Sequence, residues 1–273
     1  PGIFFTRWIT HFCAPAFVFL AGTSAFFYGR KHADLARFLV WRGIWLIVLE
    51  LTVLRVAWTF NFDFVHYVMA GVIWVIGWCM ILLAALSRLP VAVVGCIGVV
   101  VIAAHNLLDP HLEGIIAGLG TDPLSGLWKI LYIGFFAGPV QFGASGPSLM
   151  VLYSIVPWVG VMAAGFAFGA VLTQEPARRR RICTSVGMGA IALFLILRGF
   201  DLYGDPRPWR AAAHGEAGAA MPALVAFLNT NKYPPSLDFL LMTLGPTIAL
   251  MPLLERARGP VAGFVSLFGR VPF

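Results

Sequence analysis

The sequence predicts an all-α protein, a polytopic bundle of about seven to eight transmembrane helices forming a single domain over residues 1–273. Of these residues, 60% are hydrophobic and only 11% are charged, whereas a soluble domain has about 25% charged residues. Several apolar runs reach the roughly 20 residues that a helix needs to cross a bilayer. The basic residues lie mostly in short loops between these runs, as in membrane proteins of fixed orientation.

Seven runs are long and apolar enough to be spanning helices. They cover residues 9–28, 38–60, 65–86, 89–107, 149–172, 182–200 and 236–254. A shorter apolar piece, 127–142, is interrupted by Gly134, Gly138 and Pro139. It is predicted to be a re-entrant element, an interfacial element or an eighth span. The chain starts at Pro1 and ends where a further apolar segment begins, so we expect a fragment that is open at both ends.

The basic residues predict which loops face the cytoplasm. Positive charge marks four loops that alternate with the others along the chain: 29–37, 87–90, 174–181 and 255–258. By the positive-inside rule these loops are cytoplasmic. The longer loops, 108–148 and 201–235, then lie on the outer side of the membrane.

The first predicted helix carries polar residues where a spanning helix meets lipid. Residues 7–24 read RWITHFCAPAFVFLAGTS, so the first half holds Arg7, Thr10 and His11 before the apolar second half. Pro15 has no amide hydrogen, so the carbonyl of His11 loses its helical partner. Polar groups at that depth face a bundle interior or a water-filled cavity. Two interpretations follow: a proline-kinked helix with a hydrogen-bonded core histidine, or a working site at His11.

The second predicted helix contains Arg42, Glu50 and Arg55. Glu50 lies near the middle of the span, and neither arginine is placed to pair with it along the same helix. We therefore expect Glu50 to pair with another helix or to be protonated. An ion pair that fixes helix packing explains these residues as well as a functional role does.

Polar residues also gather at the outer ends of other predicted helices. His105 and Asp109 are four residues apart, so the carboxylate is placed to orient the imidazole on a helix. The alternative is that Asn106 and Asp109 simply end the helix at the interface. Before the last helix, Ser236 is predicted to be an N-cap.

The shared depth of four ionisable groups predicts a polar cavity that opens outward. These groups are His11, His66, His105 and Lys232. Each of them alone has a structural explanation, and Lys232 with Tyr233 is typical of interfacial anchors. Their convergence from separate helices favours a binding or catalytic site.

Other patterns limit the function. The chain has no zinc motif, phosphate-binding loop, dinucleotide fingerprint or serine elbow. The four cysteines have no metal-ligand spacing, so we expect buried free thiols and no metal site. The net charge of +7 reflects the cytoplasmic loops and predicts no nucleic-acid partner. An enzyme, a transporter or flippase, and an inactive scaffold remain, and no inverted repeat favours the transporter.

Four motifs, in order along the chain, resemble bacterial members of the heparan-alpha-glucosaminide N-acetyltransferase catalytic-domain family, part of the transmembrane acyltransferase superfamily. They are residues 7–24, VIWVIGWCMI at 72–81, HNLLD at 105–109 and NKYPPSL at 231–237. The resemblance covers nearly the whole chain. The family's first helix, with an Asp-x-x-Arg-Gly run and a later histidine, and its final helix are absent, so we expect a fragment that lacks both.

The resemblance implies an integral membrane acyltransferase, in a bacterium an enzyme of the inner (plasma) membrane. It would move an acyl group, most simply acetyl, from cytosolic acyl-CoA (acetyl-CoA) to an extracytoplasmic sugar or glycan. The implied partners are the lipid bilayer and the glycan acceptor, and a homo-oligomer is left open.

Three groups of residues are the candidates for this chemistry. His11, His105 and Asp109 are the catalytic candidates, because acyl transfer needs a base at neutral pH and a partner that orients it. The candidate acceptor contacts are polar residues near the outer leaflet: Arg7, Asp63, His66, Asn106, Asn231, Lys232 and Tyr233. The candidates for the acyl-CoA phosphates are the arginines Arg178, Arg179, Arg180 and Arg181, for which a simple topology signal is the alternative.

Overall fold

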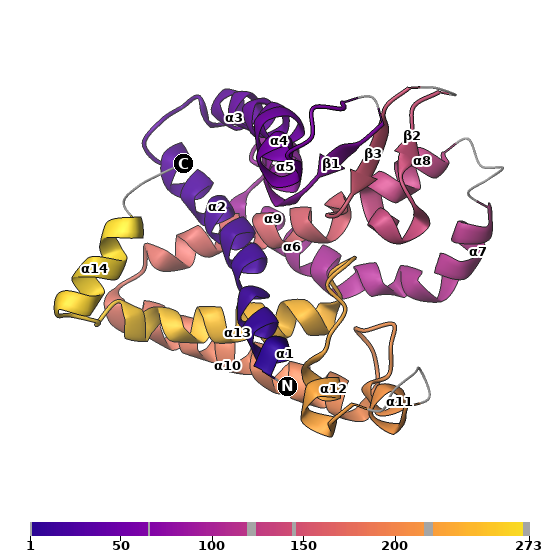
Figure 1. The fold of residues 1–273 in the computed structure, drawn as a ribbon. Coiled ribbons are helices and arrows are strands. Elements are labelled where there is room, and N and C mark those ends of the chain that lie inside the picture. Colours follow the sequence, from indigo (N-terminus) through magenta and orange to yellow (C-terminus); the bar gives the residue numbers. More distant parts are fainter. Residues whose placement is uncertain (1, 65, 119–123, 144–145, 216–220, 270–273) are drawn as a thin grey trace.

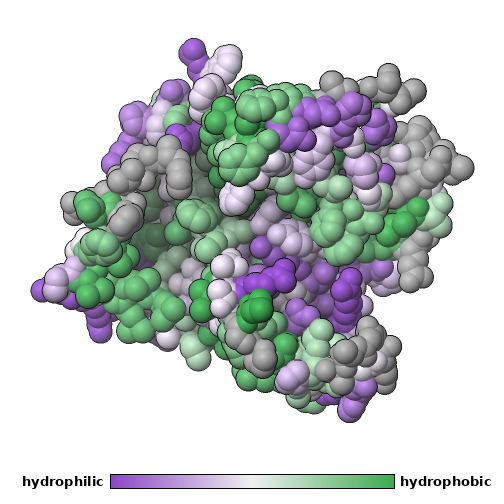
Figure 2. Space-filling model, in the orientation of Figure 1, coloured by the Kyte–Doolittle hydropathy of each residue, from purple (hydrophilic) through white to green (hydrophobic). Residues whose placement is uncertain are grey.

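The structure, a computed structural model, describes residues 2–64, 66–118, 124–143, 146–215 and 221–269. It is mostly helical, which confirms the predicted fold class (Figure 1). Within the described residues, five helical segments are long and apolar enough to cross a membrane: Ile3–Gly29, Val91–His111, Ile155–Leu172, Pro176–Phe200 and Leu237–Leu254. Shorter apolar segments are Val72–Leu86 and Ser125–Ala137. Figure 2 shows broad apolar areas on the face that it displays, as expected for helices that meet lipid.

The first helix is divided at the position that Pro15 predicts. α1 (Gly2–Thr10) ends before a turn at His11 and Phe12, and α2 (Cys13–Gly29) follows. The amide of Ala16 donates to the carbonyl of Phe12, so the helical ladder resumes immediately after Pro15. The interruption places the His11 side chain at a break between two helices.

Small residues let α2 lie close against α9 (Ile155–Leu172). A side chain added at Gly22 or Gly165 would collide with the backbone of the other helix. The Thr23 hydroxyl lies 3.0 Å from the carbonyl oxygen of Gly165, which ties the two backbones together. Such close approach through small residues is the usual way in which membrane helices pack.

The second predicted helix is continuous but contains a π-helical turn. α3 (Leu35–Leu49) leads through η1 (Glu50–Leu54) into α4 (Arg55–Thr59). Oε2 of Glu50 accepts hydrogen bonds from the amides of Ile73 (2.9 Å) and Trp74 (3.3 Å) at the start of α5 (Val72–Leu86). The expectation that Glu50 pairs with another helix is therefore confirmed, and its partners are the otherwise unpaired amides at the N-terminus of that helix.

Two predicted helices begin later than expected, because their first residues form a small sheet. Its strand order is β1 (Val68–Ala70), β3 (Ser148–Val151), β2 (Val140–Gln141). β1 and β3 are parallel, with Val68 opposite Leu149 and Ala70 opposite Val151. The sheet fixes the entries to α5 and α9, and hydrophobicity alone does not distinguish such short strands from helix ends.

The interrupted piece around 127–142 forms no continuous helix. It consists of α8 (Ser125–Trp128), the π turn η3 (Lys129–Ile133) and the 3-10 turn η4 (Gly134–Ala137), and then enters β2. Gly134 and Gly138 have φ of 69° and 75°. These left-handed conformations favour glycine and end each turn.

The remaining elements complete the bundle. They are α6 (Val91–Ala104), the 3-10 turn η2 (His105–His111), α7 (Leu112–Gly118), α10 (Pro176–Phe200), α11 (Trp209–His214), α12 (Ala223–Leu228), α13 (Leu237–Leu254) and α14 (Pro260–Gly269). α10 and α13 lie side by side, and α6 packs on α9 (Figure 1). The short helices α11 and α12 lie together near the end of α10 (Figure 1). They place a group of polar residues at the end of α10 where the bundle meets the loop 201–235.

Candidate functional site

The turn over residues 231–236 is the centre of the candidate site. The amide of Ser236 donates to the carbonyl of Asn231 at 2.9 Å, which closes the turn. The side-chain amide of Asn231 donates to the carbonyls of Tyr233 (3.3 Å) and Pro234 (3.1 Å). The Ser236 hydroxyl accepts from the amide of Phe239 at 3.1 Å, so the predicted N-cap of α13 is confirmed. Lys232 and Tyr233 are therefore displayed from a fixed backbone.

His105 is buried against this turn, at 5% exposure. Its Nε2 lies 2.8 Å from the carbonyl oxygen of Pro235, and its Nδ1 lies 2.9 Å from that of Ile102 and 3.1 Å from that of Val101. Both ring nitrogens thus face backbone oxygens of two different segments. In this arrangement His105 ties the end of α6 to the turn.

Asp109 does not orient His105, and the prediction of that pair was wrong. One Asp109 oxygen accepts from the side-chain amide of Asn106 at 2.6 Å, and the other lies 2.7 Å from the Tyr132 hydroxyl. The reason is that residues 105–111 tighten into a 3-10 turn. In such a turn residues three apart are aligned, so Asn106 rather than His105 faces Asp109. Asn106 also accepts from the amide of Leu237 at 2.8 Å, which attaches it to α13.

His11 lies at the break between α1 and α2, with a ring nitrogen that has no partner. Its Nδ1 is buried and forms no hydrogen bond to any described residue. The ring meets Phe239 of α13 edge-on, with centroids 5.6 Å apart. Lys232 of the turn and the exposed Arg7 lie within electrostatic range of the ring. The structure thus brings His11 and Lys232 into one neighbourhood from opposite parts of the chain.

Aromatic hydroxyls surround Lys232. Its Nζ is 5.2 Å from the ring centre of Tyr233 and 5.9 Å from that of Tyr153. The hydroxyls of Tyr153 and Tyr233 are 3.5 Å apart. Burial, and then the neighbouring Tyr233, raises the pKa of Tyr153 above its ordinary value, so this hydroxyl stays protonated at neutral pH and is available as a donor.

The N-terminus of α9 adds two buried donors that the sequence did not single out. Ser154 is the N-cap residue of α9, and Trp158 lies one turn into the helix. Their exposures are 1% and 0%. Neither the Ser154 hydroxyl nor the Trp158 indole nitrogen has a hydrogen-bond partner among the described residues. Trp158 packs on Tyr153, with centroids 5.5 Å apart, so both donors belong to the same neighbourhood.

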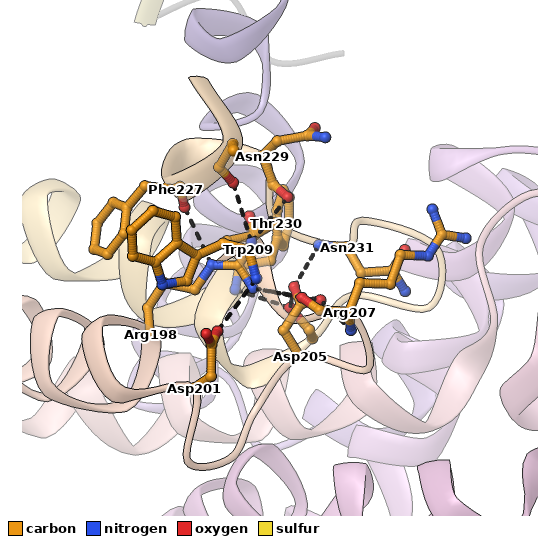
Figure 3. A network of polar contacts seen from close by, with 12 residues as sticks. Arg198, Asp201, Asp205, Arg207, Trp209, Phe227, Asn229, Thr230 and Asn231 are labelled. Carbon is orange, nitrogen blue, oxygen red and sulfur yellow. Dashed lines mark hydrogen bonds and ion pairs between the residues drawn. The ribbon is translucent and has the colours of Figure 1, made fainter. Parts of the chain in front are cut away.

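A buried arginine organises the loop before the turn (Figure 3). Arg198, near the end of α10, is 2% exposed. Its guanidinium donates to four carbonyl oxygens of the loop, those of Arg207 (3.0 Å), Phe227 (3.1 Å), Asn229 (3.2 Å) and Ala226 (3.3 Å). It also lies 3.6 Å from Oδ1 of Asp205. One side chain therefore fixes the backbone at several points of the loop.

Asp205 connects Arg198 to the turn (Figure 3). Its carboxylate accepts from the amides of Asn231 (2.7 Å) and Arg207 (3.0 Å) and from the Ser236 hydroxyl (3.1 Å). Burial raises the pKa of Asp205 above its usual range, while Arg198 and these donors act in the opposite direction. Sequence reasoning missed both residues. The available signal was an arginine inside the apolar run 182–200, which needs a partner in a membrane protein.

Other predicted site residues lie elsewhere. His66 and Asp63 form an exposed pair, with Nδ1 2.6 Å from Oδ2. At the other end of α10, Arg179 forms an ion pair with Glu255, whose Oε1 is 2.8 Å from Nε. Arg180 and Arg181 line a cavity of about 410 Å³ together with Thr184, Ser185, Pro252, Leu253 and Arg256.

Residues 3–201 match the family described as heparan-alpha-glucosaminide N-acetyltransferase, catalytic. The chain belongs to this family. No curated protein and no solved structure gave a match. Three of the four motifs that carried the resemblance fall inside the matched residues, and the fourth, at 231–237, lies beyond them.

Family membership indicates which chemistry the residues around the turn would serve. The family's description names an N-acetyltransferase, and acetyl transfer needs an acyl donor, a proton acceptor and hydrogen-bond donors for a carbonyl oxygen. The neighbourhood of the turn contains an unpartnered imidazole nitrogen, a lysine and several hydroxyl or indole donors. Among the described residues, no group of histidine, cysteine or acidic side chains is arranged to hold a metal ion.

Proposed function

We propose that this protein is an integral membrane acyltransferase that moves an acyl group, most simply acetyl, from acyl-CoA to a sugar or glycan on the opposite side of the membrane. The observation that carries the proposal is the ring nitrogen of His11, which has no partner among the described residues and lies within electrostatic range of Lys232, in a chain of the acetyltransferase family. Membership of that family favours acyl transfer over transport.

His11 is the proton acceptor in this proposal. Its Nδ1 has no partner in the part of the chain that the structure describes, so the nitrogen is available to a hydroxyl or amine of the acceptor. The acceptor heteroatom attacks the thioester carbonyl, its new bond to carbon forms, and the carbon–sulfur bond breaks. The imidazole takes the acceptor's proton and passes it to the departing thiolate. An imidazole suits both steps because the same ring nitrogen can accept a proton and then donate it.

Donors around the turn would stabilise the oxyanion that forms during the attack. Lys232, Tyr153 and Tyr233 supply a charge and two hydroxyls within one small region. The unpartnered donors of Ser154 and Trp158 are further candidates, because a buried donor without a partner gains most from a new acceptor.

His105, Asn106 and Asp109 have a positioning role in this proposal. His105 is bonded to the carbonyl of Pro235, and Asn106 accepts from the amide of Leu237, which holds the turn and the start of α13 in place. Asp109 acts through Asn106, from which it accepts a hydrogen bond. Asn231 keeps the turn closed. The exposed residues Arg7, Asp63 and His66 are proposed as rim contacts for an incoming acceptor.

The two ends of α10 divide the substrates between the two sides of the membrane. The 25 residues of α10 extend over about 37 Å, and a bilayer core is about 30 Å thick. We place the arginine end in the cytoplasm, where Arg178, Arg180 and Arg181 attract the phosphates of acyl-CoA, while Arg179 is held by Glu255. The turn end then faces the periplasm of a bacterium, with the protein in the inner membrane.

The proposal is tested with membranes that contain the protein, radiolabelled acetyl-CoA and a panel of glycans that carry free amino or hydroxyl groups. We expect label to appear in at least one glycan and to be absent with membranes from cells that lack the gene. Uptake of a glycan across sealed vesicles without any acetylation would favour transport and contradict the proposal. A matched reaction with His32→Ala, a substitution in the exposed basic loop, controls for expression.

A further inference from the structure

A cavity of about 630 Å³ lies between the start of α3 and the end of α5, and none of the candidate-site residues line it. The two helices run side by side (Figure 1). Their backbones meet at Gly43 and Gly77, because a side chain added at either glycine would lie 2.6 Å from the carbonyl oxygen of the other. The cavity lies beyond this contact, where α3 begins, and its volume is that of a small-molecule site.

This cavity lies at the same end of the bundle as the arginine start of α10. α2 and α9 are parallel, since a side chain added at Gly165 would meet Phe19, and one added further along at Gly169 would meet Phe26. α3 follows α2 through the loop after Gly29, and α10 follows α9. In the orientation proposed above, the cavity therefore opens at the cytoplasmic surface, at the level of the lipid headgroups.

Two arginines give the cavity its charge. Arg37 comes from the start of α3, and Arg88 comes from the turn after α5. Both side chains are exposed, and neither forms an ion pair within the part of the chain that the structure describes. Asp34 also lines the cavity, and its Oδ1 accepts from the Tyr28 hydroxyl at 3.2 Å. The lining thus has two cations and one carboxylate, so a ligand with a single negative charge balances it.

An exposed apolar stripe leads from the cavity along α3. Trp41 lines the cavity and is 64% exposed. Ile44, Trp45 and Val48 follow it on the same face of the helix, and all three are exposed. Tryptophan is typical of the membrane interface, and an exposed apolar face beyond it meets hydrocarbon. A ligand that is bound at the arginines can therefore extend a hydrocarbon chain along this stripe, which a soluble phosphate lacks.

We infer that this cavity binds the headgroup of an anionic phospholipid, in its simplest form phosphatidylglycerol. The phosphodiester oxygens accept from Arg37 and Arg88, since guanidinium groups suit phosphate geometry. The headgroup hydroxyls donate to Asp34, and one acyl chain lies along Trp41 and Trp45. Because the two arginines come from different helices, a bound lipid links the start of α3 to the end of α5. The site is independent of the acyl-transfer proposal and takes no part in the bond changes.

The test compares two double variants that lose the same charge. Arg37→Gln/Arg88→Gln removes both cavity cations, whereas Arg30→Gln/Lys31→Gln removes two exposed cations of the preceding loop that do not line the cavity. Trp41→Ala tests the stripe. The full chain, purified in a non-ionic detergent, is titrated with dioleoylphosphatidylglycerol and separately with dioleoylphosphatidylcholine, and native mass spectrometry gives a dissociation constant for each lipid. Glycerol 3-phosphate and coenzyme A are added as soluble phosphates that compete.

We expect the wild type to bind phosphatidylglycerol more tightly than phosphatidylcholine. An arginine near an anionic headgroup strengthens binding about fivefold, so the cavity variant should lose about 25-fold in affinity for phosphatidylglycerol. Its affinity for phosphatidylcholine should change little, and Arg30→Gln/Lys31→Gln should keep the wild-type preference. Trp41→Ala should weaken binding of both lipids, because they share the acyl chain.

Three results would overturn the inference. A wild-type preference in Arg37→Gln/Arg88→Gln would show that the cavity does not bind the headgroup. An equal loss in both double variants would show that general surface charge attracts the lipid. Unchanged binding in Trp41→Ala, or displacement of the lipid by either soluble phosphate at equal concentration, would assign the cavity to a soluble phosphate. If the double variant fails to fold, Arg37→Gln and Arg88→Gln are measured singly, each with an expected loss of about fivefold. Binding needs no acetyl transfer, so failure of the proposed function leaves this test intact.

Discussion

Arginine side chains lie in opposite environments at the two ends of α10. At its start, Arg178 and Arg181 are exposed, and Arg179 has a single acidic partner in Glu255. Near its other end, Arg198 is 2% exposed and is surrounded by four carbonyl oxygens and a buried carboxylate. The run of four arginines is the more conspicuous feature of the sequence. Arg198, however, is the arginine that fixes the backbone of the loop after α10.

The difference follows from the environment of each charge. An exposed ion pair contributes about 0–1 kcal/mol, because water screens it and the side chains lose entropy. A buried charge is costly without partners, so its partners become fixed in space. The exposed arginines are thus free to meet a soluble anion, whereas Arg198 is committed to holding the backbone carbonyls of residues 207, 226, 227 and 229.

The largest loss of stability is expected when Arg198, at the buried end of α10, is replaced. Arg198→Met removes the donors of four carbonyls and leaves the carboxylate of Asp205 buried without its cation. Breaking a buried pair from one side costs about 3–5 kcal/mol. We expect a large loss of folded protein in detergent, measured by fluorescence-detected size exclusion after heating. Arg180→Gln is the control and should melt with the wild type, and an equal loss in both variants would contradict the comparison.

A double mutant sharpens this prediction. Adding Asp205→Asn to Arg198→Met removes the unpaired charge, so part of the stability should return. Residues in direct contact couple by about 0.5–3 kcal/mol. Unfolding of the two single variants and the double variant in denaturant measures the coupling. If the losses of unfolding free energy in the two single variants add up to the loss in the double variant, Arg198 and Asp205 stabilise the loop independently.

A smaller loss of stability is expected when Ser236, which donates to Asp205, is replaced. Ser236→Ala removes the N-cap of α13 and a donor to Asp205, at distances of 3.1 Å in both cases. Loss of a serine N-cap costs about 1 kcal/mol. The melting temperature should fall slightly relative to Ser185→Ala, an exposed serine near the arginine end. Equal melting of the two variants would mean that the turn does not depend on this cap.

The smallest effect on stability is expected at the exposed end. Arg180→Gln and Arg181→Gln should leave the free energy of unfolding within about 0.5 kcal/mol of wild type, as for most surface changes. If these arginines attract acyl-CoA, its KM should rise severalfold while the KM for the acceptor stays constant. A rise of the acceptor KM instead would reverse the assignment of the two sides.

The sequence predicted those features that depend on local chemistry. The all-α class follows from long apolar runs, the break after Thr10 from the missing amide of Pro15, and the cap of α13 from Ser236. The strands β1 and β3 were not predicted, because they pair segments about 80 positions apart in the chain. Such long-range pairing leaves no periodic signal in a short apolar stretch.

The candidate site was predicted only in part, again because contacts between distant segments leave no local signal in the sequence. Proximity of His11 and Lys232 was expected from their shared depth; Lys232 lies within electrostatic range of the His11 ring, and a cavity shared by the two stays a prediction. The partner of Asp109 was predicted wrongly, because the 3-10 turn changes which residues align. Arg198 was missed because its four partners are backbone carbonyls, which carry no side-chain signal.

The central claim is that His11 handles the proton in acyl transfer at the turn. Its most direct test is the rate of acetyl transfer by His11→Ala, compared with wild type and with His32→Ala at equal expression. Removing a general acid or base lowers the rate by about 10²- to 10⁴-fold, so we expect a loss in this range for His11→Ala and wild-type turnover for His32→Ala. Wild-type turnover in His11→Ala would show that the proton is handled elsewhere and would contradict the account.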